Sequence, residues 1–159
     1  MASFDRYIPM TDDEVWTFLA GQKIMSVATI SAKTQPHNTP VWYVVHDRKL
    51  YFRAAPSKVK VRNIKTNPLA SCTVESGEKY TELRGVTILA EARVVTDESL
   101  RQQINAELLR KYEAERNYVL MPKRWREMFE FEEREIIELT PIKIASWDNG
   151  KWLHQKHQH

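Results

Sequence analysis

Short β-branched runs divided by tight turns limit the fold of this chain more than any other feature of its sequence. The first three runs occupy residues 23–31, 37–46 and 50–54, with only the turns at 32–35 and 47–49 between them. This spacing predicts an antiparallel meander. Further strands are expected at residues 69–76, 80–96 and 134–148, and the strand at 80–96 should bend near Gly85.

Helices are expected between and beside these strands. Thr11 and Glu14 match a capping box and predict an N-terminal helix that Gly21 ends. A short helix is expected at residues 57–66, with Ser57 at its N-cap position.

Two more helices are expected in the second half of the chain. Asp97 can cap one that runs to about Tyr112, and residues 121–131 predict a short one with Pro122 in its first turn. Residues 148–150 resemble a hairpin turn that returns the chain through 151–154.

These elements predict a single domain over residues 1–159, with residues 153–159 as a frayed tail. Many strands with few helices, in no regular alternation, indicate a mainly β protein with flanking helices. A closed or half-closed antiparallel barrel is expected, and a doubly wound sheet is not.

Composition excludes several classes of protein. The chain has 159 residues, is 42% apolar and lacks an apolar run long enough to cross a membrane. Cys72 is the lone cysteine, and no basic and apolar secretory signal precedes the first helix, so we expect a reducing, cytoplasmic environment. The formal net charge of +3 is small for a nucleic-acid-binding domain.

The basic charge is concentrated between residues 51 and 68. Its members are Arg53, Lys58, Lys60, Arg62 and Lys65, and the acids nearest to them are Asp47 and Glu75. On a helix, Lys58, Arg62 and Lys65 share one face, which is typical of a solvated surface. Lys60 lies almost opposite, on an inward side shared with Val59, Asn63 and Ile64. Lys60 either extends its stem to solvent or binds an anion there.

The start of this helix favours the anion. The Ser57 hydroxyl and the free N–H groups of the first turn would converge, and the helix dipole attracts negative charge to that point. Arg53 can approach the same point from the preceding strand. The set is too compact for a nucleic-acid backbone, so the sequence predicts a small ligand that carries a phosphate.

The order of these segments resembles the pyridoxamine 5′-phosphate oxidase-like family, the split β-barrel superfamily of flavin and deazaflavin oxidoreductases. The resemblance covers residues 24–95 and 134–148, and its best marks are Pro36, Pro40, Val41 and the segment 57–64. It implies a homodimer of six-stranded Greek-key barrels with FMN-type cofactors at the subunit interface. The ring would lie against the second strand, and the phosphate near the basic helix.

The cofactor-binding residues that we predict are His37, Thr39, Pro40, Val41, Trp42, Arg53, Ser57, Lys58, Lys60, Asn63 and Trp147. Trp42 and Trp147 could stack on the ring or shape its pocket, and Trp147 could reach the site of the partner subunit. Buried tryptophans are more often ordinary core or interface packing.

The resemblance implies a flavoprotein oxidoreductase acting on a small organic substrate. FMN is the leading cofactor, coenzyme F-420 the alternative, and FAD or haem less favoured. The arginine-then-lysine phosphate segment and the C-terminal substrate-binding residues of true pyridoxamine phosphate oxidases are not found, so vitamin B6 oxidation is not expected. No nucleophile–base pair or metal-ligand set is found either, and no catalytic residue is assigned.

A non-catalytic carrier or sensor of a cofactor stays open as an alternative function. A haem carrier would need His37 or His46 in the cleft. A nucleic-acid binder is disfavoured by the inward Lys60.

Overall fold

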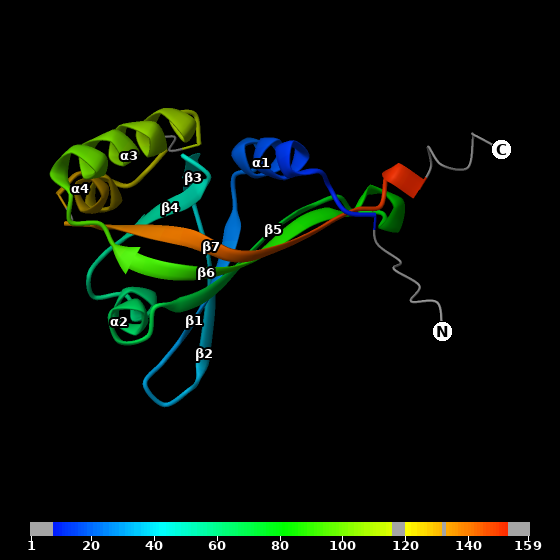
Figure 1. Cartoon of the computed structure of the whole chain (residues 1–159). Coiled ribbons are helices and arrows are strands. Elements are labelled where there is room, and N and C mark those ends of the chain that lie inside the picture. The colour runs from blue at the N-terminus through cyan, green and yellow to red at the C-terminus, as the bar shows by residue number, and fades with distance from the viewer. Residues whose placement is uncertain (1–7, 116–119, 132, 153–159) are drawn as a thin grey trace.

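The structure is a computed structural model that describes residues 8–115, 120–131 and 133–152 (Figure 1). Its elements in chain order are α1 (Asp12–Gly21), β1 (Met25–Ile30), β2 (Pro36–Val41), β3 (Tyr43–His46), β4 (Lys49–Ala54), α2 (Val59–Thr66), β5 (Leu69–Ser76), a 3-10 turn (Tyr80–Glu82), β6 (Arg84–Val94), α3 (Glu98–Lys111), α4 (Lys123–Phe131) and β7 (Glu135–Asp148). The strands form one antiparallel sheet, and the helices flank it.

The sheet has seven strands in the order β2-β1-β5-β6-β7-β4-β3, and its two outer strands are joined by Trp42 alone. Strands about 4.8 Å apart would place the outer strands of a flat sheet roughly 29 Å from each other. One linking residue spans about 7 Å at most, so the sheet must curl until its edges meet. The predicted mainly β split barrel with flanking helices is confirmed.

The expected count of six strands is wrong by one, and the difference lies at Trp42. The predicted strand over residues 37–46 exists, but its two halves pair with different neighbours. β2 pairs with β1, and β3 pairs with β4. The chain therefore bends at Trp42 where a single straight strand was expected.

The main core fills the concave side of the sheet. Alternate side chains of β1 and β5 point into it, among them Met25, Val27 and Cys72. α1 adds Phe18 and Leu19, and α2 adds Val61 and Ile64. Thr11 caps α1 through the expected capping box.

A second cluster lies between α3 and the opposite side of β3, β4 and β7. It contains Val44, Tyr51, Ile104, Leu108, Tyr112 and Ile136, with Val95. Asp97 caps α3 by accepting a hydrogen bond from the Leu100 N–H, and Tyr112 is the C-cap, as expected. This part of the sheet is therefore covered on both faces.

On the outward side of β1, β2 and β5, no described helix covers the sheet. Small and polar side chains line a pocket of about 450 Å³ there, and no described helix contributes to it. Its lining residues are Ile24, Ser26, Ala28, Asn38, Ser71, Thr73 and Glu75. We call this surface the open sheet face.

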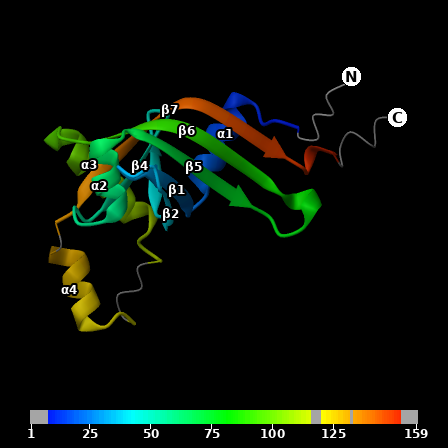
Figure 2. The same cartoon turned by 90° about the horizontal axis from the view of Figure 1, so that it is seen from below.

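Figure 2 shows that α4 lies away from the sheet.

Two local expectations are corrected at the far end of the sheet. The irregularity of β6 is a register shift at Leu89/Ala90, whereas Gly85 leaves room for Trp147. A Cβ at Gly85 would lie 2.1 Å from the Trp147 ring. After Asp148 the chain turns into a short helical segment at 151–152 where a returning strand was expected. The predicted frayed tail, 153–159, lies outside the described residues.

Among the described helices, none has the length and apolar character that a membrane crossing requires.

A buried carboxylate joins three strands. Glu138 on β7 is 2% exposed and accepts hydrogen bonds from Tyr51 (2.8 Å), Arg93 (2.7 and 3.1 Å) and Lys49 (3.3 Å). Burial alone would raise the pKa of Glu138, but the hydrogen bonds from Arg93, Tyr51 and Lys49 outweigh it and lower the pKa to about 2. The group is therefore ionised in the folded protein at neutral pH.

The lowered pKa predicts acid-sensitive stability. Glu138 should stabilise the fold above its unfolded pKa and lose that contribution as the pH falls from about 4.5 towards 2. Glu138→Gln should lower the free energy of unfolding by about 2–3 kcal/mol at pH 7 and flatten this acid dependence. Urea titrations across the pH range measure both effects. Glu78→Gln, in an exposed turn, is the control. A parallel pH profile for wild type and Glu138→Gln would contradict the prediction.

Candidate functional site

The start of α2 differs from the expected one by a single residue. α2 is Val59–Thr66, so Lys58 occupies the N-cap position predicted for Ser57, and no side chain caps the helix. Both Ser57 and Lys58 are exposed. The free N–H groups of the first turn are therefore not satisfied by a capping side chain, and these two exposed polar residues lie beside them.

The faces of α2 are mostly as predicted. Arg62 and Lys65 are exposed, and Lys65 Nζ lies 3.6 Å from Glu135 Oε1. The expectation that Val59 faces inward is wrong, because Val59 is 38% exposed and Val61 is fully buried instead. The helix begins one residue later than expected, and its buried side consists of Val61, Asn63 and Ile64.

Lys60 lies half-buried at the border of these two faces. Burial lowers its pKa, and the positive charge of Lys58 lowers it further. Within the described part of the chain, no carboxylate pairs with Lys60. An anion bound beside Lys60 would favour its charged form and so raise its pKa again.

Asn63 connects α2 to the first two strands. It is buried, and its Nδ2 donates to Thr29 Oγ1 at 3.0 Å. Thr29 on β1 pairs directly with His37 on β2, and Val27 pairs with Thr39. Opposite residues in an antiparallel pair share a face, so His37 and Thr39 lie on the same side of the sheet as α2.

Two polar atoms on β2 have no hydrogen-bond partner among the described residues. They are His37 Nδ1 and Thr39 Oγ1, and both are buried from solvent. Buried polar groups are normally paired, so orphaned ones need an explanation such as a bound molecule. β2 is also an outer strand of the sheet. Val41 follows on the same inward side, whereas Pro40 is exposed on the opposite one.

Trp42 and Arg53 are both engaged with α3. The Trp42 ring stacks on Tyr112 with centroids 4.5 Å apart and planes within 8°. Arg53 Nη1 donates to Asn105 Oδ1 at 2.8 Å. The structure thus places these two residues at the border between the barrel and α3, with one face of the Trp42 ring already covered.

Trp147 is not part of this group within one protomer. It pairs with Gly85 at one end of β7, whereas Arg53 pairs with Ile136 near the other end. Eleven residues of strand at about 3.3 Å each separate Ile136 from Trp147, roughly 36 Å along β7. Trp147 also lies on the same side of the sheet as Thr87 and Thr73, which is the open sheet face.

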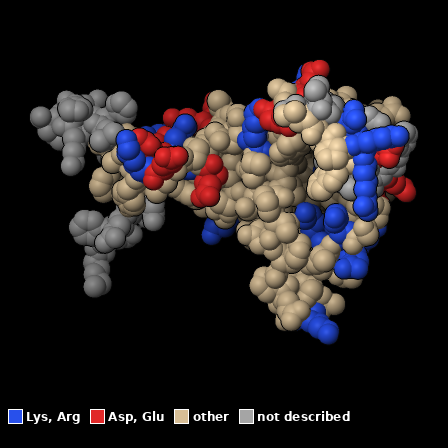
Figure 3. Space-filling view, turned by 180° about the vertical axis from the view of Figure 1, so that it is seen from behind, with Lys and Arg blue, Asp and Glu red and all other residues tan. Residues whose placement is uncertain are grey.

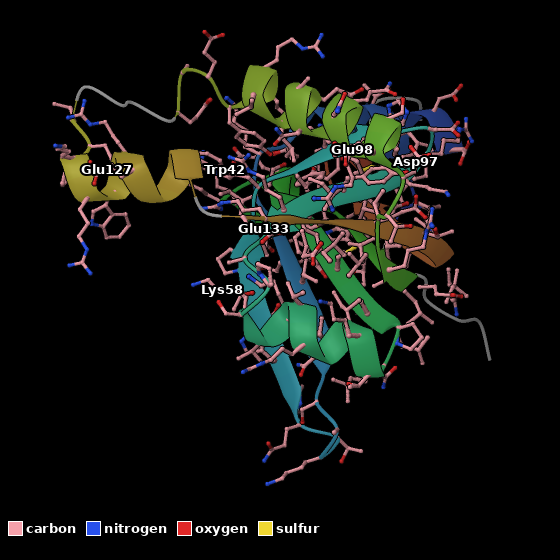
Figure 4. All side chains as sticks on the ribbon, turned by 90° about the vertical axis from the view of Figure 1, so that its left-hand side faces the viewer. Trp42, Lys58, Asp97, Glu98, Glu127 and Glu133 are labelled. Atoms are coloured by element: carbon pink, nitrogen blue, oxygen red, sulfur yellow. The ribbon has the colours of Figure 1, made fainter. Side chains whose placement is uncertain are left out.

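The figures show how the basic residues are distributed. Figure 3, the view from behind, shows lysine and arginine side chains gathered above the β1–β2 hairpin, on the side where α2 lies, with no acidic side chain among them. In Figure 4, Trp42, Lys58 and Glu133 lie on the same side of the body, and α4 with Glu127 projects from that side.

Sequence reasoning missed three residues that shape this region. Thr29 anchors Asn63, Asn105 holds Arg53, and Tyr112 covers Trp42. The alternation of β1 marks Thr29 as a polar residue on an apolar face, which is a readable signal. The contacts of Asn105 and Tyr112 depend on where α3 docks, and nothing local in the sequence gives that.

A family model described as pyridoxamine 5′-phosphate oxidase matches residues 11–148. No curated protein matches the chain. Solved structures with the same fold include Rv2991, a conserved hypothetical protein of Mycobacterium tuberculosis. It is 23% identical with a TM-score of 0.76, over 96% of this chain and 92% of that one.

Two other similar structures come from proteins described as binding a cofactor. A FAD-binding protein from Mesorhizobium loti is 13% identical with a TM-score of 0.67, over 87% of this chain and 95% of that one. HutZ, the haem storage protein from Vibrio cholerae, is 16% identical with a TM-score of 0.67, over 87% and 97%. At sequence identities of 13–23%, these structural similarities establish the fold of the chain alone.

The two lysines on opposite sides of α2 provide a matched test of the anion site. Lys60→Ala should weaken binding of a phosphorylated ligand by about 1–3 kcal/mol, because a charge-assisted hydrogen bond is lost. Lys65→Ala removes an exposed ion pair of small energy and should leave the affinity unchanged. Calorimetric titration with FMN or inorganic phosphate measures both. Equal effects from the two substitutions would contradict the assigned faces of α2.

Proposed function

Because this chain belongs to the pyridoxamine 5′-phosphate oxidase family, we propose that it is an oxidoreductase that uses a flavin-type cofactor on a small organic substrate. Two observations together carry the proposal. Lys60 is half-buried and no described carboxylate neutralises it, and His37 Nδ1 and Thr39 Oγ1 are buried without a hydrogen-bond partner among the described residues. A phosphate would neutralise Lys60, and a ring with polar edges would hydrogen-bond to His37 and Thr39.

The phosphate end of the cofactor would bind at the start of α2. Its uncapped N–H groups, Ser57, Lys58 and Lys60 offer donors and positive charge at one place. Helix N-termini with nearby cations are suited to phosphate. Arg53 is the last residue but one of β4, four positions before Ser57. Its contact with Asn105 would orient the guanidinium for the same anion.

The ring end would lie along β2. His37 and Thr39 would hydrogen-bond its polar edge, Val41 would contact its apolar part, and Asn63 would hold the local backbone through Thr29. A bound flavin or deazaflavin ring supplies the hydride transfer itself. The residues of the chain therefore need to bind, orient and exclude water, which agrees with a site that contains no acid–base pair of its own.

FMN is our first choice among the cofactors because the basic residues at the start of α2 suffice for one terminal phosphate. Coenzyme F-420 is the alternative, because Lys58, Arg62 and Lys65 form an exposed row along α2 that could hold its anionic tail. The described FAD-binding neighbour supports a flavin in general.

We further propose that two copies of the chain pair through the open sheet face. The centre of this face is a shallow pocket lined by small residues, with Ser71 and Thr73 beside Ser26 and Ala28. Exposed apolar residues such as Ile24 (53%) and Leu89 (42%) lie on it. Pairing would cover these residues, and it could bring Trp147 of one copy towards the cofactor of the other.

A carrier or sensor of a bound cofactor is the second candidate function. The haem storage protein among the similar structures favours it, and His37 has an unpartnered ring nitrogen that could ligate iron. His46 is less suitable, because its Nδ1 lies 3.0 Å from Glu107 Oε1. Haem and flavin have different visible absorption bands, so a spectrum of the protein loaded with each distinguishes them.

The cofactor proposal predicts selective, tight binding. Apo-protein titrated with FMN and with coenzyme F-420 should bind one of them with submicromolar affinity, because charge and ring contacts act together. Ring fluorescence follows the titration, and Lys60→Ala protein is the control for the phosphate. Binding to neither, nor to FAD or haem, would overturn the proposed function. Binding without turnover of any hydride acceptor would favour the carrier.

The pairing proposal predicts a dimer at micromolar concentration. Thr73→Arg should shift it towards monomer, because a buried unpaired charge costs several kcal/mol. Thr17→Arg, on the exposed side of α1, makes the same chemical change away from the interface and should have no effect. Sedimentation velocity measures both. A wild-type monomer, or an unaffected Thr73→Arg dimer, would contradict the open sheet face as the interface.

A further inference from the structure

The bend between β2 and β3 is held by one side chain from α3. Tyr112, the C-cap residue of α3, is 1% exposed, and its hydroxyl accepts a hydrogen bond from the Tyr43 N–H at 2.9 Å. The same hydroxyl lies 2.7 Å from the Tyr43 carbonyl and 2.8 Å from the Lys23 carbonyl. Its single proton serves one of these two acceptors at a time.

The ring of Tyr112 holds the preceding residue as well. It stacks on Trp42, the residue that separates the two strands. Ring and hydroxyl thus contact consecutive residues at the point where the chain changes its pairing partner. Burial raises the pKa of Tyr112 to about 12, so the hydroxyl keeps the proton that this arrangement needs.

The bend determines where β2 lies relative to α2. β2 is an outer strand with a single hydrogen-bonded neighbour, β1, so its other edge is not held by the sheet. His37 and Thr39 on its inward side must keep a fixed distance from Lys60 to bind two parts of one molecule. Tyr112 is the described residue that fixes the C-terminal end of β2 from outside the sheet.

We propose that Tyr112 is a positioning residue for the cofactor site. It acts through the Trp42–Tyr43 backbone and keeps the ring-binding strand in register with the phosphate-binding helix. This inference rests on the proposed function, because it assumes a ligand that spans β2 and α2. It differs from a purely structural role in that it predicts an effect on binding beyond any effect on folding.

Tyr43 provides the matched control. It is fully buried, and its hydroxyl donates to the Leu19 carbonyl of α1, away from the bend. Tyr112→Phe and Tyr43→Phe each delete one buried hydroxyl and keep the ring. They should lower Tm by similar amounts, whereas only Tyr112→Phe should affect the site.

The experiment measures the Kd for FMN and the visible circular dichroism of the bound flavin in wild type and both variants. Tyr112→Phe should raise the Kd by about tenfold, in the range of one lost hydrogen bond, and alter the dichroism. Tyr43→Phe should change neither. If coenzyme F-420 is the cofactor that binds, the same comparison is made with it in place of FMN. Wild type that binds none of FMN, coenzyme F-420, FAD and haem would overturn the proposed function itself. Wild type that binds while Tyr112→Phe binds equally well, or while both variants lose affinity equally, would overturn the positioning role alone.

A measurement on the wild type needs no variant and covers the case in which Tyr112→Phe does not fold. Binding of FMN should slow amide hydrogen exchange at Tyr43 together with the β2 amides, because a ligand that needs the bend should stabilise it. Protection limited to α2, with Tyr43 unchanged, would overturn the inference.

Discussion

One residue, Trp42, joins the two outer strands of the sheet, and the rest of the structure depends on that short link. A seven-stranded sheet whose edges are one residue apart in the chain must curl, and curling creates a concave side that the main core fills. α2 then closes this side against β1 and β6, with Asn63 and Ile64 buried. β2 is an outer strand of this sheet and pairs with β1, the strand that α2 contacts.

The strands, the helix caps and the basic helix could be predicted from the sequence because their signals are local. Alternation, turn residues and the capping residues Thr11 and Asp97 act within a few positions. The bend at Trp42 could not be predicted, since a β-branched run looks alike whether it keeps its partner or exchanges it. The start of α2 at Lys58 and the exposure of Val59 also depend on how the helix docks. For the same reason, the contacts of Tyr112 and Asn105 were beyond sequence reasoning.

Two sets of cations in this protein have different surroundings. On the α3 side of the sheet, Arg93 and Lys49 converge on Glu138, which is buried and fully hydrogen-bonded. There the carboxylate of Glu138 is paired with both cations inside the protein. At α2, Lys58 and Lys60 lie close enough for one to lower the pKa of the other. Among the described residues, no carboxylate pairs with either lysine, and a phosphate is the partner that we propose for them.

The separation of Trp147 from α2 has a consequence for how the site is built. β2 and α2, the proposed ring-binding strand and phosphate-binding helix, lie on the same side of the sheet. Trp147 lies on the open sheet face, about 36 Å along β7 from Ile136, the residue that pairs with Arg53. In the proposed arrangement, a single chain would anchor both ends of the cofactor but would cover only part of its ring. A second copy across the open sheet face would supply the missing wall, so affinity and solvent exclusion would have different origins. Anchoring would belong to α2 and β2, and exclusion of water to the pairing of two chains.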